Sequence, residues 1–190
     1  MKETEIIRRS FENHSSLVDK TMDKHIGNII RAAYLVMDCF ANDGKLVFFG
    51  NGGSAADSQH MAAEFTGRFL LERRSLPAIA LTTDTSILTA IGNDYGYEKI
   101  FERQVESMVK KGDVVFAIST SGNSENVVRG VLAAKNNGAK VVALTGNGGG
   151  RLGQYSDILI DIPSDETPRI QEMHLLTEHV ICDLVEKSLF

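Results

Sequence analysis

The chain has 190 residues, of which 43% are hydrophobic and 24% charged, and its formal net charge is −5. This length suffices for one domain with a full core and is too short for two ordinary ones. The negative charge without a basic block disfavours nucleic-acid binding, and no apolar run approaches the roughly 20 residues that span a bilayer.

The sequence pattern of residues 1–42 predicts one long helical segment. Apolar side chains recur at helical spacing through its second half, and Asn42-Asp43-Gly44 then ends the pattern. Because this helix precedes the first strand, we expect it to form a homo-oligomer by docking on a second subunit as well as on its own sheet. Residues 45–190 are expected to form an α/β sandwich, so that residues 1–190 make a single domain.

Strand-like and helix-like segments alternate after this helix. The expected strands are Leu46–Phe49, Ala78–Leu81, Val114–Ile118, Val141–Leu144 and Ile158–Ile162. The expected helices are Ala55–Leu71, Tyr97–Val109, Asn126–Asn137 and Thr167–Ser188. Continuous runs of Val, Ile, Leu and Phe are typical of parallel strands covered on both faces. The pattern predicts an α/β fold with a doubly wound, five-stranded parallel sheet flanked by helices, in which ligands bind beyond the carboxyl ends of the strands.

Two of the expected strands run into turns of small residues that lead into helices. The first turn is Gly50-Asn51-Gly52-Gly53-Ser54, and the second is Ser119-Thr120-Ser121-Gly122-Asn123-Ser124. Such turns present free backbone N–H groups and the positive end of a helix dipole to an anion. The second turn adds four hydroxyls, more than a helix cap needs, and has no lysine of the kind found in nucleotide-triphosphate loops. Together the turns predict a phosphorylated polyol as ligand.

The first turn also matches G-x-G-x-x-A, a loose dinucleotide-binding pattern, and Asp84 occupies the place of its ribose-binding acid. A tight turn that needs small residues for chain reversal is the plainer interpretation. A dinucleotide fold does not need the hydroxyl-rich second turn, which argues against it. A third glycine-rich stretch, residues 146–150, lacks hydroxyls and is expected to be an ordinary connection or a mobile loop.

Histidine, carboxylate and amide side chains form a second candidate feature. His60 and Glu64 lie i, i+4 on one face of an expected helix, and Gln171 and His179 lie on one side of the last helix. The four suit Zn²⁺ or another divalent transition metal. They also suit proton transfer next to a carbonyl, with Glu as base and His as acid. Other polar residues of the last helix are expected at the surface: Glu172, His174 and Glu178.

These residues, in this order, resemble the phosphoheptose isomerases, a branch of the sugar isomerase (SIS) domain proteins. The likeness covers nearly the whole chain. It is carried by the two turns, His60 with Glu64, Gly92-Asn93-Asp94, and Arg169-Ile170-Gln171-Glu172 with His174 and His179. The second turn alone identifies the wider SIS group, whereas the His60/Glu64 pair with Gln171 and His179 is more specific.

The resemblance implies an isomerase that converts D-sedoheptulose 7-phosphate to D-glycero-D-manno-heptose 7-phosphate, the first step toward nucleotide-activated heptose. It implies a cytoplasmic homotetramer with sites at subunit interfaces. Glu64 matches the base that moves a proton between C1 and C2, and His179 matches its partner acid/base. Matches to substrate-contacting positions are Asn51, Gly52, Gly53, Glu64, Asn93, Asp94, Ser119, Thr120, Ser121, Ser124 and Gln171. Matches to the ligands of one Zn²⁺ per subunit are His60, Glu64, Gln171 and His179.

The sequence leaves two questions open. Either metal-free Glu64 and His179 act as acid and base, or zinc polarises the carbonyl while Glu64 exchanges roles during turnover. The rival functions are an isomerase of a shorter sugar phosphate and a non-catalytic SIS module that binds a phosphosugar or a replication initiator protein. Such a module does not need Glu64 and His179 together, which favours the isomerase.

Overall fold

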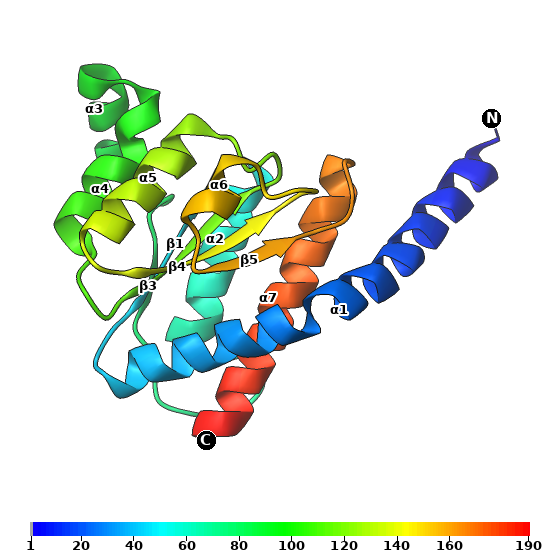
Figure 1. Cartoon of the computed structure of the whole chain (residues 1–190), viewed down its shortest axis with the longest axis horizontal. Helices are drawn as coiled ribbons and strands as arrows, with labels where there is room; N and C mark the ends of the chain where they lie inside the picture. The colour runs from blue at the N-terminus through cyan, green and yellow to red at the C-terminus, as the bar shows by residue number, and fades with distance from the viewer. Residues whose placement is uncertain (1) are drawn as a thin grey trace.

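After one long helix, the chain alternates strands and helices to its end (Figure 1). The structure is a computed structural model and describes residues 2–190. The helices are α1 (Glu3–Ala41), α2 (Gly53–Thr66), α3 (Thr85–Tyr95), α4 (Ile100–Met108), α5 (Glu125–Asn136), α6 (Gly150–Tyr155) and α7 (Thr167–Leu189), with a 3-10 turn, η1, at Tyr97–Lys99. The strands are β1 (Leu46–Gly50), β2 (Ala78–Ala80), β3 (Val114–Ser119), β4 (Lys140–Thr145) and β5 (Ile158–Asp161).

Within residues 2–190, the five strands form one sheet in the order β2-β1-β3-β4-β5, and every neighbouring pair is parallel. All residues of β1 and β3 are buried. Parallel strands covered on both faces read as continuous apolar runs, and the predicted doubly wound sheet is confirmed. In the register, Gly50 lies opposite Ile118, so the turns that follow β1 and β3 emerge side by side at the carboxyl edge.

Two hydrophobic clusters cover the two faces of the sheet. Successive residues of a strand point to opposite faces, and Phe48 and Phe49 show this alternation. Phe48 stacks on Phe116 at 4.9 Å between ring centroids, in the cluster with α1, α2 and α7. Phe49 stacks on Phe101 of α4 at 5.0 Å, in the cluster with α5 and α6. Figure 1 accordingly places α1 and α7 on one side and α4 and α5 on the other.

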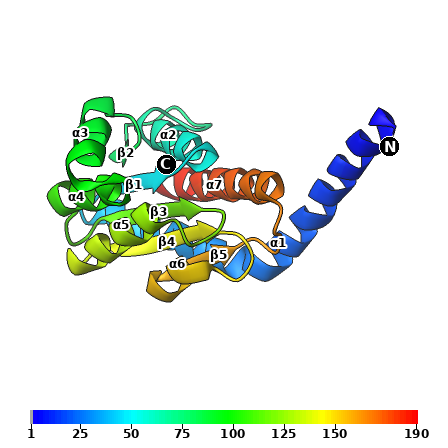
Figure 2. The ribbon, with the colours of Figure 1, turned by 90° about the horizontal axis from the view of Figure 1, so that it is seen from above.

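The N-terminal part of α1 projects away from the rest of the structure (Figure 2). The first buried residue of this helix is Leu17, and most of its buried residues lie in the C-terminal half, which packs in the cluster with α7. Ile6, Ile7 and Phe11 are exposed on the projecting part. The helix therefore carries an apolar surface beyond what its own chain covers.

Four features of the fold differ from the predicted elements. The expected helix Tyr97–Val109 is a 3-10 turn, η1, followed by α4. α2 ends at Thr66, not at Leu71, because the N–H groups of the next segment bond to the Glu186 carboxylate and not to helix carbonyls. α3 and α6 were not predicted. α3 buries no residue fully and is capped by Asp84, whose Oδ1 accepts from the N–H of Ile87 at 2.9 Å. Asp84 is thus a helix cap, a structural role that accounts for an acid at this position without a bound ribose.

Both cysteines, Cys39 and Cys182, are buried and free. Burial is the main cause that raises the pKa of Cys39 to about 11, with Asp113 adding to it, and burial likewise raises the pKa of Cys182. Among the helices of residues 2–190, none combines the length and the apolar character that crossing a membrane requires.

Candidate active site

The first turn, between β1 and α2, leaves room for close approach because three of its five residues are glycines. Gly52 has φ +57°, a left-handed conformation that favours glycine. A Cβ at Gly53 would collide with the side-chain amide of Gln171 from α7. The absence of a side chain at Gly53 therefore lets Gln171 reach the start of α2. This contact places Gln171, a predicted site residue, at the first turn.

Asn51 in the first turn is held by a residue that sequence reasoning did not single out. Its Nδ2 donates to Oδ1 of Asn126 at 2.8 Å, and Nδ2 of Asn126 donates back to Oδ1 of Asn51 at 2.9 Å. The hydroxyl of Tyr97 donates to the same Oδ1 of Asn51 at 3.3 Å. Because Asn126 lies at the start of α5, which follows the second turn, the reciprocal pair ties the two turns together.

The second turn gathers its hydroxyls at one place. Ser119 Oγ lies 3.0 Å from Ser124 Oγ and 3.4 Å from Ser121 Oγ. Ser124 is the N-cap residue of α5, yet its side chain makes no capping bond. Three hydroxyls therefore gather at the N-terminus of α5, the end of a helix whose N–H groups favour an anion.

The third glycine-rich stretch, residues 146–150, packs against the second turn. It was expected to be an ordinary connection or a mobile loop. Gly146 N donates to Thr120 O at 2.9 Å, and Leu152 N donates to Gly122 O at 3.0 Å. Gly122 has φ +65°, and a Cβ there would collide with the carbonyl of Gly149. Backbone-to-backbone contact of this kind explains why glycines occur on both sides.

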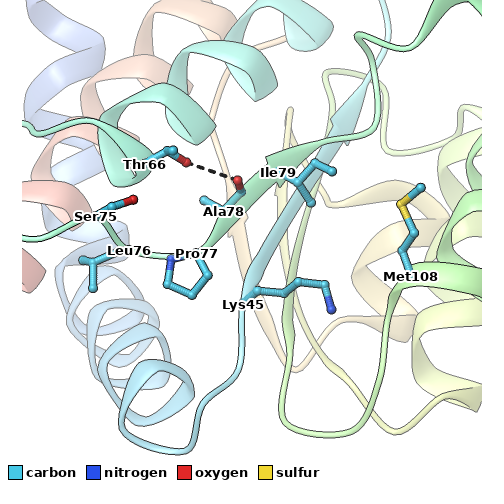
Figure 3. Close-up of a pocket in the computed structure, with 8 residues that line it drawn as sticks. All are labelled: Lys45, Thr66, Ser75, Leu76, Pro77, Ala78, Ile79 and Met108. Atoms are coloured by element: carbon cyan, nitrogen blue, oxygen red, sulfur yellow. Dashed lines mark hydrogen bonds between the residues drawn. The ribbon is translucent and has the colours of Figure 1, made fainter.

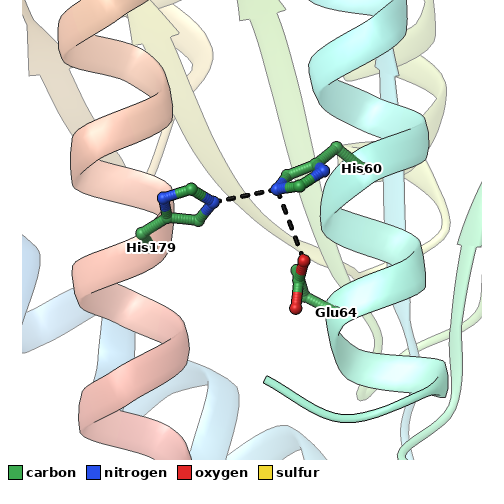
Figure 4. A group of neighbouring side chains, drawn as sticks. All are labelled: His60, Glu64 and His179. Atoms are coloured by element: carbon green, nitrogen blue, oxygen red, sulfur yellow. Dashed lines mark hydrogen bonds and ion pairs between the residues drawn. The ribbon is translucent and has the colours of Figure 1, made fainter. Parts of the chain in front are cut away.

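His60, Glu64 and His179 meet between α2 and α7 (Figure 4). Nε2 of His60 lies 2.8 Å from Nε2 of His179 and 3.4 Å from Oε1 of Glu64. Burial lowers the pKa of His179, the neighbouring His60 lowers it further, and Glu64 acts in the opposite direction. The neutral imidazole that results can accept a proton or bind a metal.

One ligand atom from each of these three side chains lies within 4.8 Å of the other two. Two imidazole nitrogens and a carboxylate oxygen at such separations form a donor set that a divalent transition metal accepts. Of the four predicted metal ligands, His60, Glu64 and His179 come together from two helices as a possible metal-binding triad, and Gln171 is not one of this group.

Asn93 and Asp94, the remaining predicted site residues, lie near the end of α3. Nδ2 of Asn93 donates to Oδ1 of Asp94 at 2.8 Å. Within residues 2–190 these two side chains hydrogen-bond to none of the other predicted site residues. The neighbouring Tyr97 links this part of the chain to Asn51.

Two side chains of α7 expected at the surface are fully buried. His174 Nε2 hydrogen-bonds to Thr145 O at 3.0 Å, and desolvation lowers its pKa to about 4 against the opposing effect of that bond. Both carboxylate oxygens of Glu178 are without a hydrogen-bond partner among the described residues. Burial raises the pKa of Glu178 well above its ordinary value, and Asp57 adds to the effect. Both α7 residues lie on the helix face that also carries the apolar Ile181 and Val185. This helical spacing could have predicted their burial from the sequence.

A pocket of about 420 Å³ opens at the opposite edge of the sheet, at the amino ends of β1 and β2 (Figure 3). Its charged lining group is Lys45, whose Nζ is paired with the buried carboxylate of Asp113 at 2.5 Å. The lining is otherwise largely apolar and includes Leu76, Pro77 and Met108. Because ligands of parallel α/β sheets bind at the carboxyl ends of the strands, this pocket is not the candidate site.

Residues 11–146 match the SIS domain. The chain is 49% identical over 183 residues to a phosphoheptose isomerase of Aliarcobacter butzleri, covering 96% of this chain and 97% of the relative. The chain belongs to the phosphoheptose isomerase family. A second member, from Geobacter sulfurreducens, is 57% identical over 164 residues, which are 86% of this chain and 87% of that protein.

Solved members of the family share the whole fold. The phosphoheptose isomerase of Neisseria gonorrhoeae superposes with a TM-score of 0.93 at 43% identity, covering 98% of this chain and all of the other. That of Francisella tularensis gives a TM-score of 0.95 at 37% identity over the same share of both chains. The family and the fold predicted from the sequence are therefore confirmed.

Proposed function

We propose that this protein isomerises D-sedoheptulose 7-phosphate to D-glycero-D-manno-heptose 7-phosphate, the first step toward nucleotide-activated heptose. The observation that carries the proposal is the His60/Glu64/His179 cluster in a chain that also has a hydroxyl-lined phosphate turn. Relatives at about half identity over nearly the full length are named phosphoheptose isomerases. A non-catalytic phosphosugar-binding module would need the turn and not the cluster.

The second turn supplies the phosphate grip in this proposal. Hydroxyls of Ser119, Ser121 and Ser124, with Thr120 and the first N–H groups of α5, bind the 7-phosphate. The sugar lies along the backbone of Gly52 and Gly53, with Asn51, Asn93, Asp94 and Gln171 as further contacts. A grip on the distal phosphate orients the substrate through binding energy far from the reacting carbons.

The reaction moves one proton between adjacent carbons. Glu64 removes a proton from C1, which gives an enediol, and returns it to C2. His179 moves a proton between the oxygens on those carbons, so that the C2 carbonyl becomes a hydroxyl as C1 becomes the aldehyde. The lowered pKa of His179 keeps its imidazole neutral near pH 7, the form that can accept and then donate a proton.

We assign one Zn²⁺ per subunit to His60, Glu64 and His179, with Gln171 as a fourth ligand. The geometric support is the convergence of two imidazole nitrogens and one carboxylate oxygen. Bound to these residues, zinc would supply a Lewis acid next to the substrate carbonyl. A carboxylate bound to zinc is a weaker base, so removing the metal tests which role of Glu64 limits turnover.

We infer that a second copy of the chain covers the outer face of α1 and α7, within a homotetramer whose sites lie at subunit interfaces. An apolar groove of about 410 Å³ runs between these helices, and Met22, Ile26 and Val180 in it are partly exposed. Ile26→Glu should shift the mass in sedimentation velocity toward smaller species, and an unchanged tetramer would contradict this interface. The buried free thiols suit the reducing cytoplasm, where we place the protein.

The direct test of substrate class is conversion of a heptulose phosphate and a hexulose phosphate side by side. We expect D-sedoheptulose 7-phosphate to be isomerised with the higher kcat/KM. Preference for the hexulose phosphate would reassign the substrate, and conversion of neither, with tight binding of both, would favour a binding module.

A further inference from the structure

A buried ion pair holds the segment that follows α2. Glu186 in the last turn of α7 and Arg73 each have side chains 2% exposed, and Arg73 Nε donates to Glu186 Oε1 at 2.8 Å. The same carboxylate accepts three consecutive backbone N–H groups, from Phe69 at 3.1 Å and from Leu70 and Leu71 at 2.7 Å each. Burial alone would raise the pKa of Glu186, but these donors together hold it below its ordinary value.

Arg73 uses its Nη groups mainly on the end of α2, and its Nη1 also donates to Arg74 O at 3.0 Å. Its Nη2 donates to Glu64 O at 2.8 Å, and its Nη1 donates to Phe65 O at 3.0 Å and to Gly67 O at 3.3 Å. The last carbonyls of a helix have no partner within the helix, so Arg73 caps the end of α2. The helix end that Arg73 fixes is the one that carries the side chain of Glu64.

The first residue of the clamped segment reaches the candidate site. The ring of Phe69 lies 5.5 Å from the imidazole of His179, at an interplanar angle of 34°. The imidazole of His179 also contacts that of His60, with 5.1 Å between the ring centroids. Phe69 thus limits the positions that the His179 ring can take, and the bond from its own N–H to Glu186 fixes Phe69.

We propose that Glu186, Arg73 and Phe69 are positioning residues that set the geometry of the His60/Glu64/His179 cluster. Glu186 links the two helices that supply the cluster: it extends from α7, and through Arg73 it holds the end of α2. None of the three residues needs to touch the substrate. Outer partners of metal ligands and catalytic groups commonly change affinity or activity by about 10- to 100-fold. The expected effect on kcat rests on the proposed isomerase function. The expected effect on the position of the His179 ring rests on the geometry alone.

Four full-length variants test the proposal. Glu186→Gln breaks the ion pair, Phe69→Leu removes the ring and leaves the clamp, and Phe69→Tyr restores a ring. Glu72→Gln is the matched control, because it makes the same chemical change in the same segment at a side chain that is 91% exposed and paired with Arg68 at 3.7 Å. If Glu186→Gln does not fold, Phe69→Leu carries the test.

We expect Glu186→Gln and Phe69→Leu to lower kcat for D-sedoheptulose 7-phosphate by about 10- to 100-fold, with KM close to that of the wild type. Both should weaken binding in a titration with Zn²⁺ alone, and Phe69→Tyr should restore both values. In ¹⁵N spectra of metal-free protein, His179 should show one tautomer in the wild type and averaged tautomers in Phe69→Leu.

Phe69→Leu with the kcat, Zn²⁺ affinity and His179 spectrum of the Glu72→Gln control would overturn the proposal. A loss of thermal stability alone would assign the clamp to folding and would also overturn it. If the wild type fails to convert the sugar phosphate, the proposed function fails, and the tautomer spectra still decide the positioning role.

Discussion

Asn51 and Asn126 exchange two side-chain amide hydrogen bonds, of 2.8 and 2.9 Å, across the gap between the two turns. Asn126 is buried at the start of α5, and Asn51 lies in the first turn. The pair therefore fixes the first turn relative to α5. It thereby joins the two turns that we propose as the contacts of the sugar and of its phosphate. A long substrate can be oriented only if these two parts keep a fixed separation.

Asn126→Ala should raise KM for the sugar phosphate by up to about 10-fold, because the half-buried amide of Asn51 loses its partner, at a cost of about 0.5–1.5 kcal/mol for a typical hydrogen bond. The control is Asn137→Ala at the other end of α5, which loses bonds from Nδ2 to Val109 O at 2.9 Å and to Val105 O at 3.2 Å. Both variants should unfold at lower urea, and only Asn126→Ala should change KM. An unchanged KM in Asn126→Ala would show that Asn51 does not need this link.

The fold was predictable from the sequence where local pattern and packing agree. The apolar runs of β1 and β3 lie in the centre of the sheet and read as buried strands without ambiguity. The end of α2 was not predictable, because Leu70 and Leu71 continue a helical pattern while their N–H groups bond to Glu186, more than a hundred residues later in the chain. A long-range electrostatic partner overrides local propensity there.

Some residues of the candidate site were likewise predictable from the sequence, and others were not. His60 and Glu64 are recognisable because both residues of the pair lie on one helix face. Asn126 was missed because an amide at the start of a helix ordinarily caps the helix, and its partner lies 75 residues away in the chain. The buried state of Glu178 was missed because a charged residue is nearly always exposed unless it is paired.

Glu178→Gln should stabilise the protein above about pH 5. The pKa of Glu178 is raised in the folded state, chiefly by burial, so the folded chain holds a proton that the unfolded chain has released. The stability that this group contributes is present below its unfolded pKa, about 4.3, and is lost as the pH rises through the folded pKa. Urea unfolding should give similar stabilities at pH 4 and a more stable variant at pH 8. A variant less stable than the wild type at pH 8 would contradict this assignment.

His174→Gln should change how the free energy of unfolding depends on pH on the acid side. With its pKa lowered from 6.5 to about 4, His174 stays neutral in the folded protein while the unfolded chain takes up a proton. Stability is therefore present above pH 6.5 and is lost as the pH falls toward 4. Glutamine keeps a donor toward Thr145 O and does not titrate. Between pH 7 and pH 5 the wild type should lose about 2 kcal/mol more than the variant, and equal losses would refute the buried neutral histidine.

Zn²⁺ should stabilise the protein against heat in proportion to the logarithm of its free concentration. A free Zn²⁺ concentration of 100 times the dissociation constant should raise the free energy of unfolding by about 2.7 kcal/mol. The variants His60→Ala and His179→Ala should lose most of this stabilisation. His14→Ala is the control, because His14 pairs with Glu172 away from the triad. Removing the metal with a chelator should abolish turnover and adding Zn²⁺ should restore it. Full turnover without metal would assign the chemistry to Glu64 and His179 acting alone.

The central claim is that Glu64 moves the proton between C1 and C2 of a phosphorylated heptulose. The most direct measurement follows D-sedoheptulose 7-phosphate in D₂O by NMR with wild type and Glu64→Gln. We expect the wild type to form the aldose with deuterium incorporated at the reacting carbons. Glu64→Gln should still bind the sugar phosphate and should lose about 10²–10⁴-fold in both rates. Turnover and deuterium incorporation near the wild-type rates in Glu64→Gln would contradict the account.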